Sequence, residues 1–496
     1  MTAPVAILGA GPAGLALACA LSRLEVPCAL FDEAPGPDAQ GPPLTLCSRS
    51  LEMLHRWGLT RAALARGLPL RRARFTLLGH TFGYLPTSEL PSQYPFLLCL
   101  EPRDLVELLA AGAARAELRW GQRVKGLRQV PGGLELWAGD GRQRFRWVAV
   151  TRPWLRERLE MPLEPGTAPP PAWTARVAPE PETQYAVHLH PRGLARVLPC
   201  PGGPWHLTLQ AFSGGEEAPG QILAEMGLDF QGLEPVELPS AVGVAPLLAL
   251  ESVFLLGPGA HSGGRGVLWT PDLEMAEAEN LAWKLAAVLR GAPPALLETY
   301  DLERRPVARA SLELLDRLSP LLSRARLMRR VAPTLRAAFV RKALGLQIGG
   351  LAGTYPPSFA CLESEPPGPW ARQRFRRGAG AGQRCPEVRF VDGQGRRRWL
   401  HDLLGQHPVV LRFDGEQPGA GFRVSRTEQG PMILHDPEGS LHEAFAAGPG
   451  SCVALRPDGV VGYRAWREAP GGVEAYLENI WPSDPSTPRP GGFTSC

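Results

Sequence analysis

The chain has 496 residues, more than one ordinary hydrophobic core holds, so we expect two or three domains. A hydrophobic fraction of 44% and a charged fraction of 21% are those of a globular protein, and a formal net charge of only +4 speaks against a nucleic-acid partner. No uncharged apolar run is long enough for a transmembrane helix.

The cysteines and the first residues predict a cytoplasmic protein. The nine cysteines are odd in number, form no CxxC pair and lie in several cases within apolar runs. This usage favours reduced, buried thiols over a disulfide framework. The opening stretch "MTAPVAILGAG" has no basic region before its apolar run, so we interpret it as a buried strand and not as a signal peptide.

The first predicted elements form a βαβ unit. The apolar run 4–8 has the length of a strand, "GAGPAG" follows it, and residues 15–27 have the apolar spacing of a helix. A second strand follows in "CALFDEAP". The order strand, glycine turn, helix, strand is that of a dinucleotide-binding fold.

Further elements follow in chain order. The spacing predicts helices over 49–59, 103–116 and 272–291, and alternating, strand-like patterns fill much of 117–150 and 184–256. Arg-rich helices continue to about residue 346, where we expect solvated faces and not a membrane-binding surface.

The glycine turn is the first candidate site. Gly9 allows the tight turn, Gly11 lets the backbone approach a pyrophosphate, and Gly14 lets the helix pack on the strand. The helix N-terminus adds unpaired N–H groups and a positive dipole end. Asp32, at the end of the second strand, is the candidate for the ribose hydroxyls, with Glu33 as the alternative. The competing interpretation is a βαβ unit that keeps its glycines for packing alone.

Four segments carry a resemblance to a known family: "VAILGAGPAGLALACALSRLEVPCALFDEAP", "RSLEMLHRWGL", "NLAWKLAAVLRGAPPALLETYDLERRPVA" and "CVALRPDGVVGYR". The most specific matches are Asn280, Trp283, Lys284, Tyr300, Glu303, Arg304, Arg305, Pro306, Arg456, Pro457, Asp458 and Gly459. The chain resembles the FAD-dependent aromatic hydroxylases, the para-hydroxybenzoate hydroxylase-like group A flavoprotein monooxygenases. It is most similar to their long members, which act on polyketides and phenols and carry a C-terminal thioredoxin-like domain.

The resemblance implies an α/β (α+β overall) protein with a discontinuous Rossmann-type FAD domain, interleaved with a mixed-sheet substrate domain. It implies that NADPH or NADH reduces FAD and that O2 then serves to hydroxylate an aromatic small molecule. The predicted division is an FAD-binding segment with an inserted part of the substrate domain over 1–172, a substrate-domain sheet over 173–250, a second FAD segment with helices over 251–361, a linker over 362–384, a thioredoxin-like domain over 385–481 and a disordered tail over 482–496. The C-terminal domain either braces the catalytic body or pairs subunits in a homodimer.

Two stretches depart from the family pattern. The family has Gly-Asp-Ala-Ala-His where this chain has Gly257, Pro258 and then "GAH". Pro258 offers neither a side-chain acceptor nor an N–H group, and the loss of such a buried hydrogen bond costs about 1–3 kcal/mol. The family's Asp-Gly motif is replaced by the run 151–153, "TRP". Its arginine is able to pair with a phosphate.

The glycine loop after the histidine also departs from the family. Aligned without gaps, it becomes residues 265–270, "RGVLWT". The alternative is that Gly263, Gly264 and Gly266 are that loop, moved forward by about one helical turn and still able to form a backbone anion site. An ordinary surface turn is the competing interpretation. Among the remaining candidates, Arg103 matches a cofactor-contacting position of the family, with a solvated arginine as the alternative.

Three histidines complete the list of candidates. His188 and His190 alternate onto one face of a predicted strand, where a hydrogen-bonded or solvent-facing pair is favoured over a metal site or a substrate contact. His261 matches a family position in either a structural or a catalytic role. No catalytic residue is assigned.

These observations predict an FAD-dependent monooxygenase that acts on an aromatic or polyketide-like small molecule. The alternative is a flavin-poor or non-redox relative that keeps the fold and binds or transforms a small molecule without FAD chemistry. A third hypothesis is that FAD is kept for another reaction or for a structural role.

Overall fold

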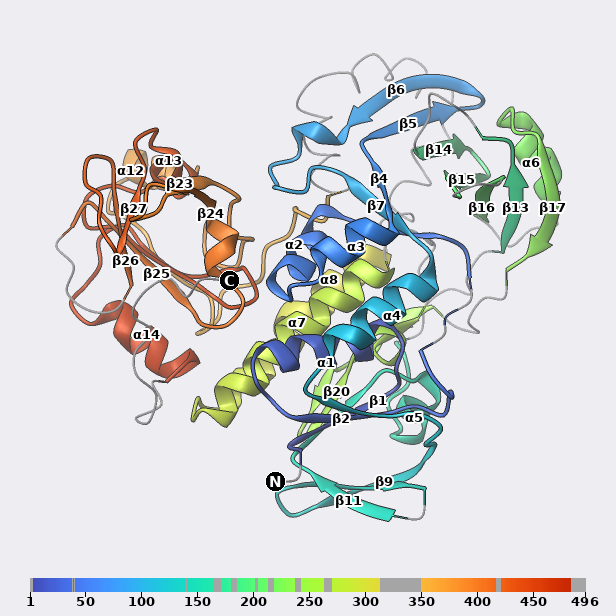
Figure 1. Ribbon diagram of the computed structural model, residues 1–496, viewed down its shortest axis with the longest axis horizontal. Coiled ribbons are helices and arrows are strands. Elements are labelled where there is room, and N and C mark those ends of the chain that lie inside the picture. The colour runs from blue at the N-terminus through green and yellow to red at the C-terminus, as the bar shows by residue number, and fades with distance from the viewer. Residues whose placement is uncertain are drawn as a thin grey trace.

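The computed structural model describes residues 3–482 apart from 38, 40, 140, 165–170, 180–184, 201–203, 213–217, 237–241, 263–269, 313–348 and 416–420. Figure 1 shows three parts: a sheet near the N-terminus, a second sheet reached through α2 and α3, and a C-terminal unit (orange to red) on the other side of the central helices. Within the described ranges, every helix is too short or too polar to span a bilayer.

The N-terminal sheet has six strands in the order β19-β20-β12-β1-β2-β8. All neighbours are parallel except the edge pair of β19 and β20. The strands are β1 (Val5–Leu8), β2 (Cys28–Phe31), β8 (Ala116–Arg119), β12 (Trp147–Val150), β19 (Ala249–Leu250) and β20 (Val253–Leu255). Strands from two distant parts of the chain thus share one sheet, which confirms the discontinuous Rossmann-type fold.

Helices cover this sheet. Helix α1 (Pro12–Arg23) begins with proline, whose missing N–H suits the first helical turn, and it is buried from Ala13 to Ser22. Its Ala- and Gly-rich surface lets α7 (Thr270–Leu289) pack along it, with α4 (Pro102–Gly112) beside it. Helix α5 (Pro153–Arg158) follows β12 directly. The carboxyl ends of β1, β2 and β12 therefore meet the N-termini of α1 and α5, the usual place for a ligand in such folds.

The second sheet has seven strands in the order β17-β13-β16-β15-β14-β5-β6. The pair β14 and β5 is parallel and the other pairs are antiparallel, so the sheet is mixed as expected for the substrate domain. Its strands are β5 (Arg72–Leu77), β6 (His80–Pro86), β13 (Ala172–Val177), β14 (Tyr185–His190), β15 (Gly193–Leu198), β16 (Trp205–Ala211) and β17 (Phe230–Pro235), and α6 (Pro219–Glu225) packs on β16.

Further helices, strands and 3-10 turns complete the fold. They are β3 (Leu44–Leu46), α2 (Ser48–Arg56), α3 (Thr60–Arg66), β4 (Leu68–Leu70), β7 (Leu97–Leu100), β9 (Val124–Val130), β10 (Gly133–Ala138), β11 (Gly141–Phe145), β18 (Gly243–Val244), β21 (His261–Ser262) and α8 (Glu298–Leu312), with single 3-10 turns at Thr87–Glu89, Gly257–Gly259, Pro294–Leu297 and Leu400–Leu403. The eight cysteines within the described ranges are all free.

The C-terminal unit holds an eight-stranded mixed sheet in the order β22-β29-β28-β25-β26-β27-β23-β24. Its strands are β22 (Leu362–Ser364), β23 (Arg389–Val391), β24 (Arg397–Trp399), β25 (Val409–Phe413), β26 (Phe422–Ser425), β27 (Ile433–His435), β28 (Cys452–Leu455) and β29 (Val461–Ala465). Its helices are α12 (Pro369–Phe375), α13 (Ser440–Ala444) and α14 (Gly472–Ile480). The thioredoxin-like assignment stays a prediction.

The stretch 362–384, expected to be a linker, contributes structure to this unit. Strand β22 pairs in parallel with β29. Helix α12 buries Phe375, and the guanidinium of Arg464 lies 3.6 Å from the centre of that ring. A polar, Pro-rich sequence hid these elements because one aromatic anchor, and not an apolar periodicity, holds them.

The residues that carry the family resemblance form a buried network between α7, α8 and the C-terminal sheet. Glu303 accepts hydrogen bonds from Asn280, Lys284 (2.9 Å) and both terminal nitrogens of Arg456 (2.7 and 2.9 Å). Arg456 also binds Asp458. Burial, opposed by Glu303, lowers the pKa of Lys284 to about 8. The specific motifs of this chain thus serve mainly to join its parts.

Candidate functional site

The glycine turn has the geometry that a dinucleotide site requires. Gly9 has a φ of +114°, a conformation that favours glycine, and its N–H donates to the Phe31 carbonyl. A Cβ added at Gly14 would lie 1.9 Å from the Gly9 oxygen, so only glycine lets α1 pack this closely. No described atom would lie within 4 Å of a Cβ at Gly11. The turn therefore leaves open space at Gly11, the position predicted for the pyrophosphate.

Asp32 lies at the end of β2 beside this turn. Its carboxylate accepts hydrogen bonds from the backbone N–H of Ala10 (2.6 Å) and Ala34 (2.9 Å). It also forms an ion pair with Arg152, whose Nη2 lies 2.5 Å from Oδ2. Burial alone would raise the pKa of Asp32, but the backbone donors and Arg152 outweigh it and hold the pKa below its usual value.

Arg152 fills the space that Gly9 leaves. A Cβ added at Gly9 would lie 3.0 Å from both Cγ and Nε of Arg152, and 2.3 Å from the Thr151 hydroxyl. The cavity bounded by Gly9, Asp32 and Arg152 has a volume of only about 20 Å³, near that of a single water molecule. The departure at 151–153 thus places Arg152 against Gly9 and Asp32, the residues predicted for the adenosine half of the site.

The 3-10 turn Gly257–Gly259, which we call the Gly257 segment, lies against the same glycine turn although it is far away in the sequence. Gly257 has a φ of +51°, and a Cβ there would lie 2.7 Å from the Cβ of Ala13 in α1. Its N–H donates to Glu277 of α7 at 2.8 Å. Pro258 is the middle residue of this 3-10 turn, so the place of the family's aspartate is taken by a side chain without polar atoms. Of the predicted flavin-half residues, Gly263, Gly264 and Gly266 lie outside the described residues.

A buried carboxylate, Glu274, occupies the N-terminus of α1. It lies against Gly257, and the backbone N–H of Ala13 stabilises its charged form. Burial raises the pKa of Glu274 to about 7; the nearby charge of His261 lowers it and that of Glu277 raises it. Sequence reasoning missed this residue because an acidic residue within a long helix is ordinarily solvated.

His261 forms an ion pair with Glu277, with 3.2 Å between Nε2 and Oε1, and both side chains are buried. Burial would lower the pKa of His261, but Glu277 outweighs it and the pKa lies above its usual value. This ion pair favours a structural role for His261, because its Nε2 faces the carboxylate of Glu277 in α7.

The other predicted residues lie apart from the turn. Arg103 pairs with Glu107 one helical turn along α4 at 2.8 Å, and 69% of its side chain is exposed, which matches the alternative of a solvated arginine. His188 hydrogen-bonds to Thr76 and His190 to Glu225, both at 2.9 Å. The two histidines thus have separate partners, and their contacts match the hydrogen-bonded interpretation.

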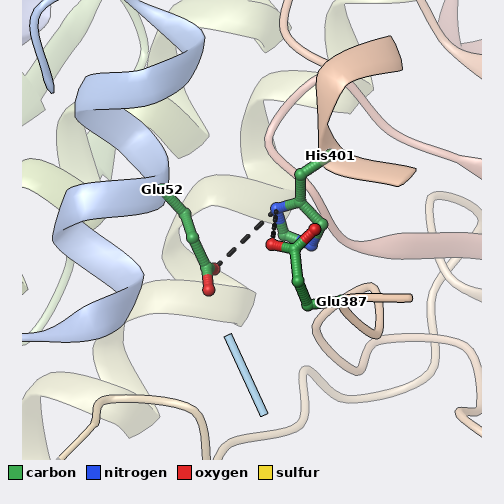
Figure 2. A group of neighbouring side chains, drawn as sticks. All are labelled: Glu52, Glu387 and His401. Atoms are coloured by element: carbon green, nitrogen blue, oxygen red, sulfur yellow. Dashed lines mark ion pairs between the residues drawn. The ribbon is translucent and has the colours of Figure 1, made fainter. Parts of the chain in front are cut away.

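Sequence reasoning also missed a buried cluster between α2 and the C-terminal unit. Glu52, Glu387 and His401 point toward one another in Figure 2, with metal-ligating atoms within 4.8 Å of one another. His401 donates from Nε2 to the Cys385 carbonyl at 2.9 Å, which leaves Nδ1 facing the two carboxyl groups at 3.8 and 3.6 Å. We name these three residues the interdomain cluster.

Two arginines make the interdomain cluster unsuited to a divalent cation. Arg384 binds both oxygens of Glu52, and Arg56 approaches Nδ1 of His401 at 3.4 Å. Burial raises the pKa of Glu387 to about 8, so a divalent cation would have to displace its proton, since metal ligands must be deprotonated. The cluster acts as a joint between domains, and its sequence signal was the charged pair Glu52 and Arg56 on a mostly buried helix.

Two comparisons of sequence extend these observations. A family model described as an FAD binding domain matches residues 2–136 and 252–314. The chain is 28% identical to 6-methylpretetramide 4-monooxygenase of Streptomyces rimosus, over 96% of this chain and 93% of that protein. It is 31% identical to a rifampicin monooxygenase of Streptomyces venezuelae, over 63% of this chain and 69% of that protein.

A solved structure confirms the fold. Aklavinone-11 hydroxylase, in complex with FAD and aklavinone, superposes with a TM-score of 0.75 at 22% identity, over 97% of this chain and 99% of that one. The two segments of the family model carry β1, β2, β8 and β20 of the N-terminal sheet together with α1 and α7. The chain therefore belongs to the FAD-dependent aromatic hydroxylases, the group A flavoprotein monooxygenases.

Proposed function

We propose that the chain hydroxylates an aromatic or polyketide-like small molecule, with FAD as cofactor, O2 as oxidant and NADPH or NADH as the source of electrons. The observation that carries the proposal is the meeting of the glycine turn with the Gly257 segment at the N-terminus of α1. The two parts lie in separate segments of one FAD-binding family model. Membership of this family, and relatives named as monooxygenases of polyketide-type compounds, support the same reaction class.

The residue types of the turn fit FAD. Gly11 and the N-terminal N–H groups of α1 would hold the pyrophosphate, Asp32 the ribose, and Gly257 would allow close approach beside α1. When bound, FAD supplies the redox chemistry, and the share of the chain is to position the reactants and to exclude water. The fit is incomplete in one respect, because Arg152 and Glu274 already contact two of these positions.

That observation supports the second candidate function, a flavin-poor or non-redox relative that binds or transforms a small molecule on the same fold. In this case the contacts of Arg152 and Glu274 are permanent parts of the core. The two functions differ in a property that is simple to measure, the presence of FAD in the purified protein.

The test is the visible absorbance spectrum of the purified protein, with any released cofactor identified after denaturation. The proposed function predicts FAD, either bound at purification or taken up on addition, and NADPH or NADH oxidation that increases with a phenolic substrate. A colourless protein that takes up no added FAD would remove the monooxygenase function and leave the second candidate.

Three further inferences belong to this proposal. The free, mostly buried thiols support a reducing, cytoplasmic setting. We infer that the chain divides into domains at the ranges predicted from the sequence, with 362–384 added to the C-terminal unit. A homodimer is the assembly that we expect if the C-terminal unit pairs subunits, and size-exclusion chromatography with light scattering tests it.

A further inference from the structure

Two hydrogen-bond donors of the glycine turn are used within the chain. The N–H of Gly9 binds the Phe31 carbonyl, and the N–H of Ala10 binds Asp32. In α1, residue 12 is proline and has no N–H, and Leu15 already bonds to the Gly11 carbonyl. The turn therefore offers N–H groups from Gly11, Ala13 and Gly14, and the second of these stabilises the charge of Glu274.

The two occupying side chains resemble the parts of a dinucleotide that they replace. Glu274 places a carboxylate at the positive end of α1, where a phosphate is otherwise favoured. Arg152 donates an N–H hydrogen bond to Asp32, the carboxylate to which ribose hydroxyl groups donate O–H hydrogen bonds in dinucleotide-binding proteins. Its side chain also lies across Gly9, the residue whose missing Cβ leaves room at the turn.

We propose that Arg152 and Glu274 set the cofactor affinity of the chain by holding its dinucleotide site closed, and that FAD binds only when both side chains are displaced. This inference rests on the proposed function. We call the two residues the internal plug. The side chain of Arg152 is 41% exposed and is able to turn outward into water. Glu274 is buried against Gly257, and its charge loses the stabilisation by the Ala13 N–H when a phosphate takes that group.

The experiment measures binding and not turnover. The dissociation constants of FAD, by quenching of its fluorescence, and of ADP, by calorimetry, are determined for the full chain after removal of any bound flavin. The variants are Arg152→Ala and Glu274→Ala, with Arg158→Ala and Glu157→Ala of α5 as matched controls. Arg158 donates to the Lys125 carbonyl, away from Asp32, and Glu157 is exposed.

Removal of either plug residue should tighten FAD and ADP binding by about tenfold or more, since each displaced contact is of the order of one factor of ten. The control variants should bind as the wild type does, and FMN, which lacks the adenosine half, should gain little from Arg152→Ala. Weaker or unchanged FAD binding in both plug variants would overturn the inference, because the two residues would then be cofactor contacts or bystanders.

Two additions keep the outcome decisive. If an alanine variant fails to fold by circular dichroism, Arg152→Gln and Glu274→Gln keep the side-chain length, remove the charge, and should tighten binding in the same direction. A wild type that binds no FAD, with variants that bind it, would support the internal plug and remove the proposed function. A wild type that binds FAD tightly and oxidises NADPH, with variants that bind no better, would overturn the internal plug and support the proposed function.

Discussion

Replacement of Glu303 by glutamine tests the buried network that joins α7, α8 and the C-terminal sheet. The carboxylate of Glu303 is fully buried and lies 2.9 Å from the ammonium of Lys284 and 2.7 Å from Arg456. Glutamine keeps the shape and an acceptor oxygen but removes the charge. Arg456 retains Asp458 as a partner, whereas the ammonium of Lys284 loses the one carboxylate that lies within ion-pair distance of it among the described residues.

The expected loss of stability is about 3–5 kcal/mol, as for other buried ion pairs with one partner removed. Deprotonation of Lys284 limits the loss. A lysine with the ordinary pKa of 10.5 needs about 5 kcal/mol to lose its proton at pH 7, at roughly 1.4 kcal/mol per pKa unit. The folded variant then lacks a proton that the unfolded chain still binds, so its stability rises with pH.

The wild type behaves differently over the same range. Its Lys284 has a pKa of about 8 and stays protonated in the folded and unfolded states below that pH. The difference in stability between wild type and variant should therefore narrow by about 1.4 kcal/mol per unit from pH 6 to pH 8.

The assay is urea denaturation followed by tryptophan fluorescence at pH 6, 7 and 8. Glu298→Gln, an exposed position of the same helix α8, is the control and should change stability by less than about 0.5 kcal/mol. Adding Lys284→Met to Glu303→Gln should recover stability, since it removes the unpaired buried amine. A loss below about 1 kcal/mol, or one that does not change with pH, would refute the reasoning.

Two further predictions concern the turn and the interdomain cluster. Gly14→Ala should cost at least about 2 kcal/mol by urea denaturation, because its Cβ would lie 1.9 Å from the Gly9 oxygen, whereas Gly11→Ala should leave stability unchanged and weaken FAD binding. Glu387→Gln should increase the free energy of unfolding at pH 8 by about 4 kcal/mol more than it does at pH 5. The folded-state pKa of Glu387, about 8, exceeds its ordinary 4.5, so wild-type stability falls across this window; the exposed Glu438→Gln should show no such trend.

Local patterns predicted much of the fold. The βαβ unit was predictable because strand, glycine turn and helix follow one another within the first 31 residues, and α7 because its apolar spacing extends over five turns. The stretch 362–384 was not, because β22 has no apolar periodicity and forms only by pairing with β29. Local patterns define elements, whereas pairing partners that lie far away in the chain decide whether a short polar segment becomes one of them.

The candidate site was predictable only in part, for a related reason. The sequence placed Gly9, Gly11, Gly14 and Asp32 correctly at one turn. It did not reveal that Asp32 pairs with Arg152, 120 positions further along the chain. Such ion pairs carry no local signal, since charged residues at these positions are usually solvated.

A glycine turn defines the geometry of its donors but not the group that binds them. The N-terminus of a helix favours any anion, and a carboxylate of the same chain competes there at an effective concentration in the range of about a millimolar or more. FAD therefore binds only if its remaining contacts with the chain outweigh the interaction of this carboxylate with the helix N-terminus. FAD content should therefore follow the FAD concentration during purification, whereas an open turn would stay saturated. Dialysis against buffer with and without FAD, followed by the absorbance spectrum, separates these two behaviours directly.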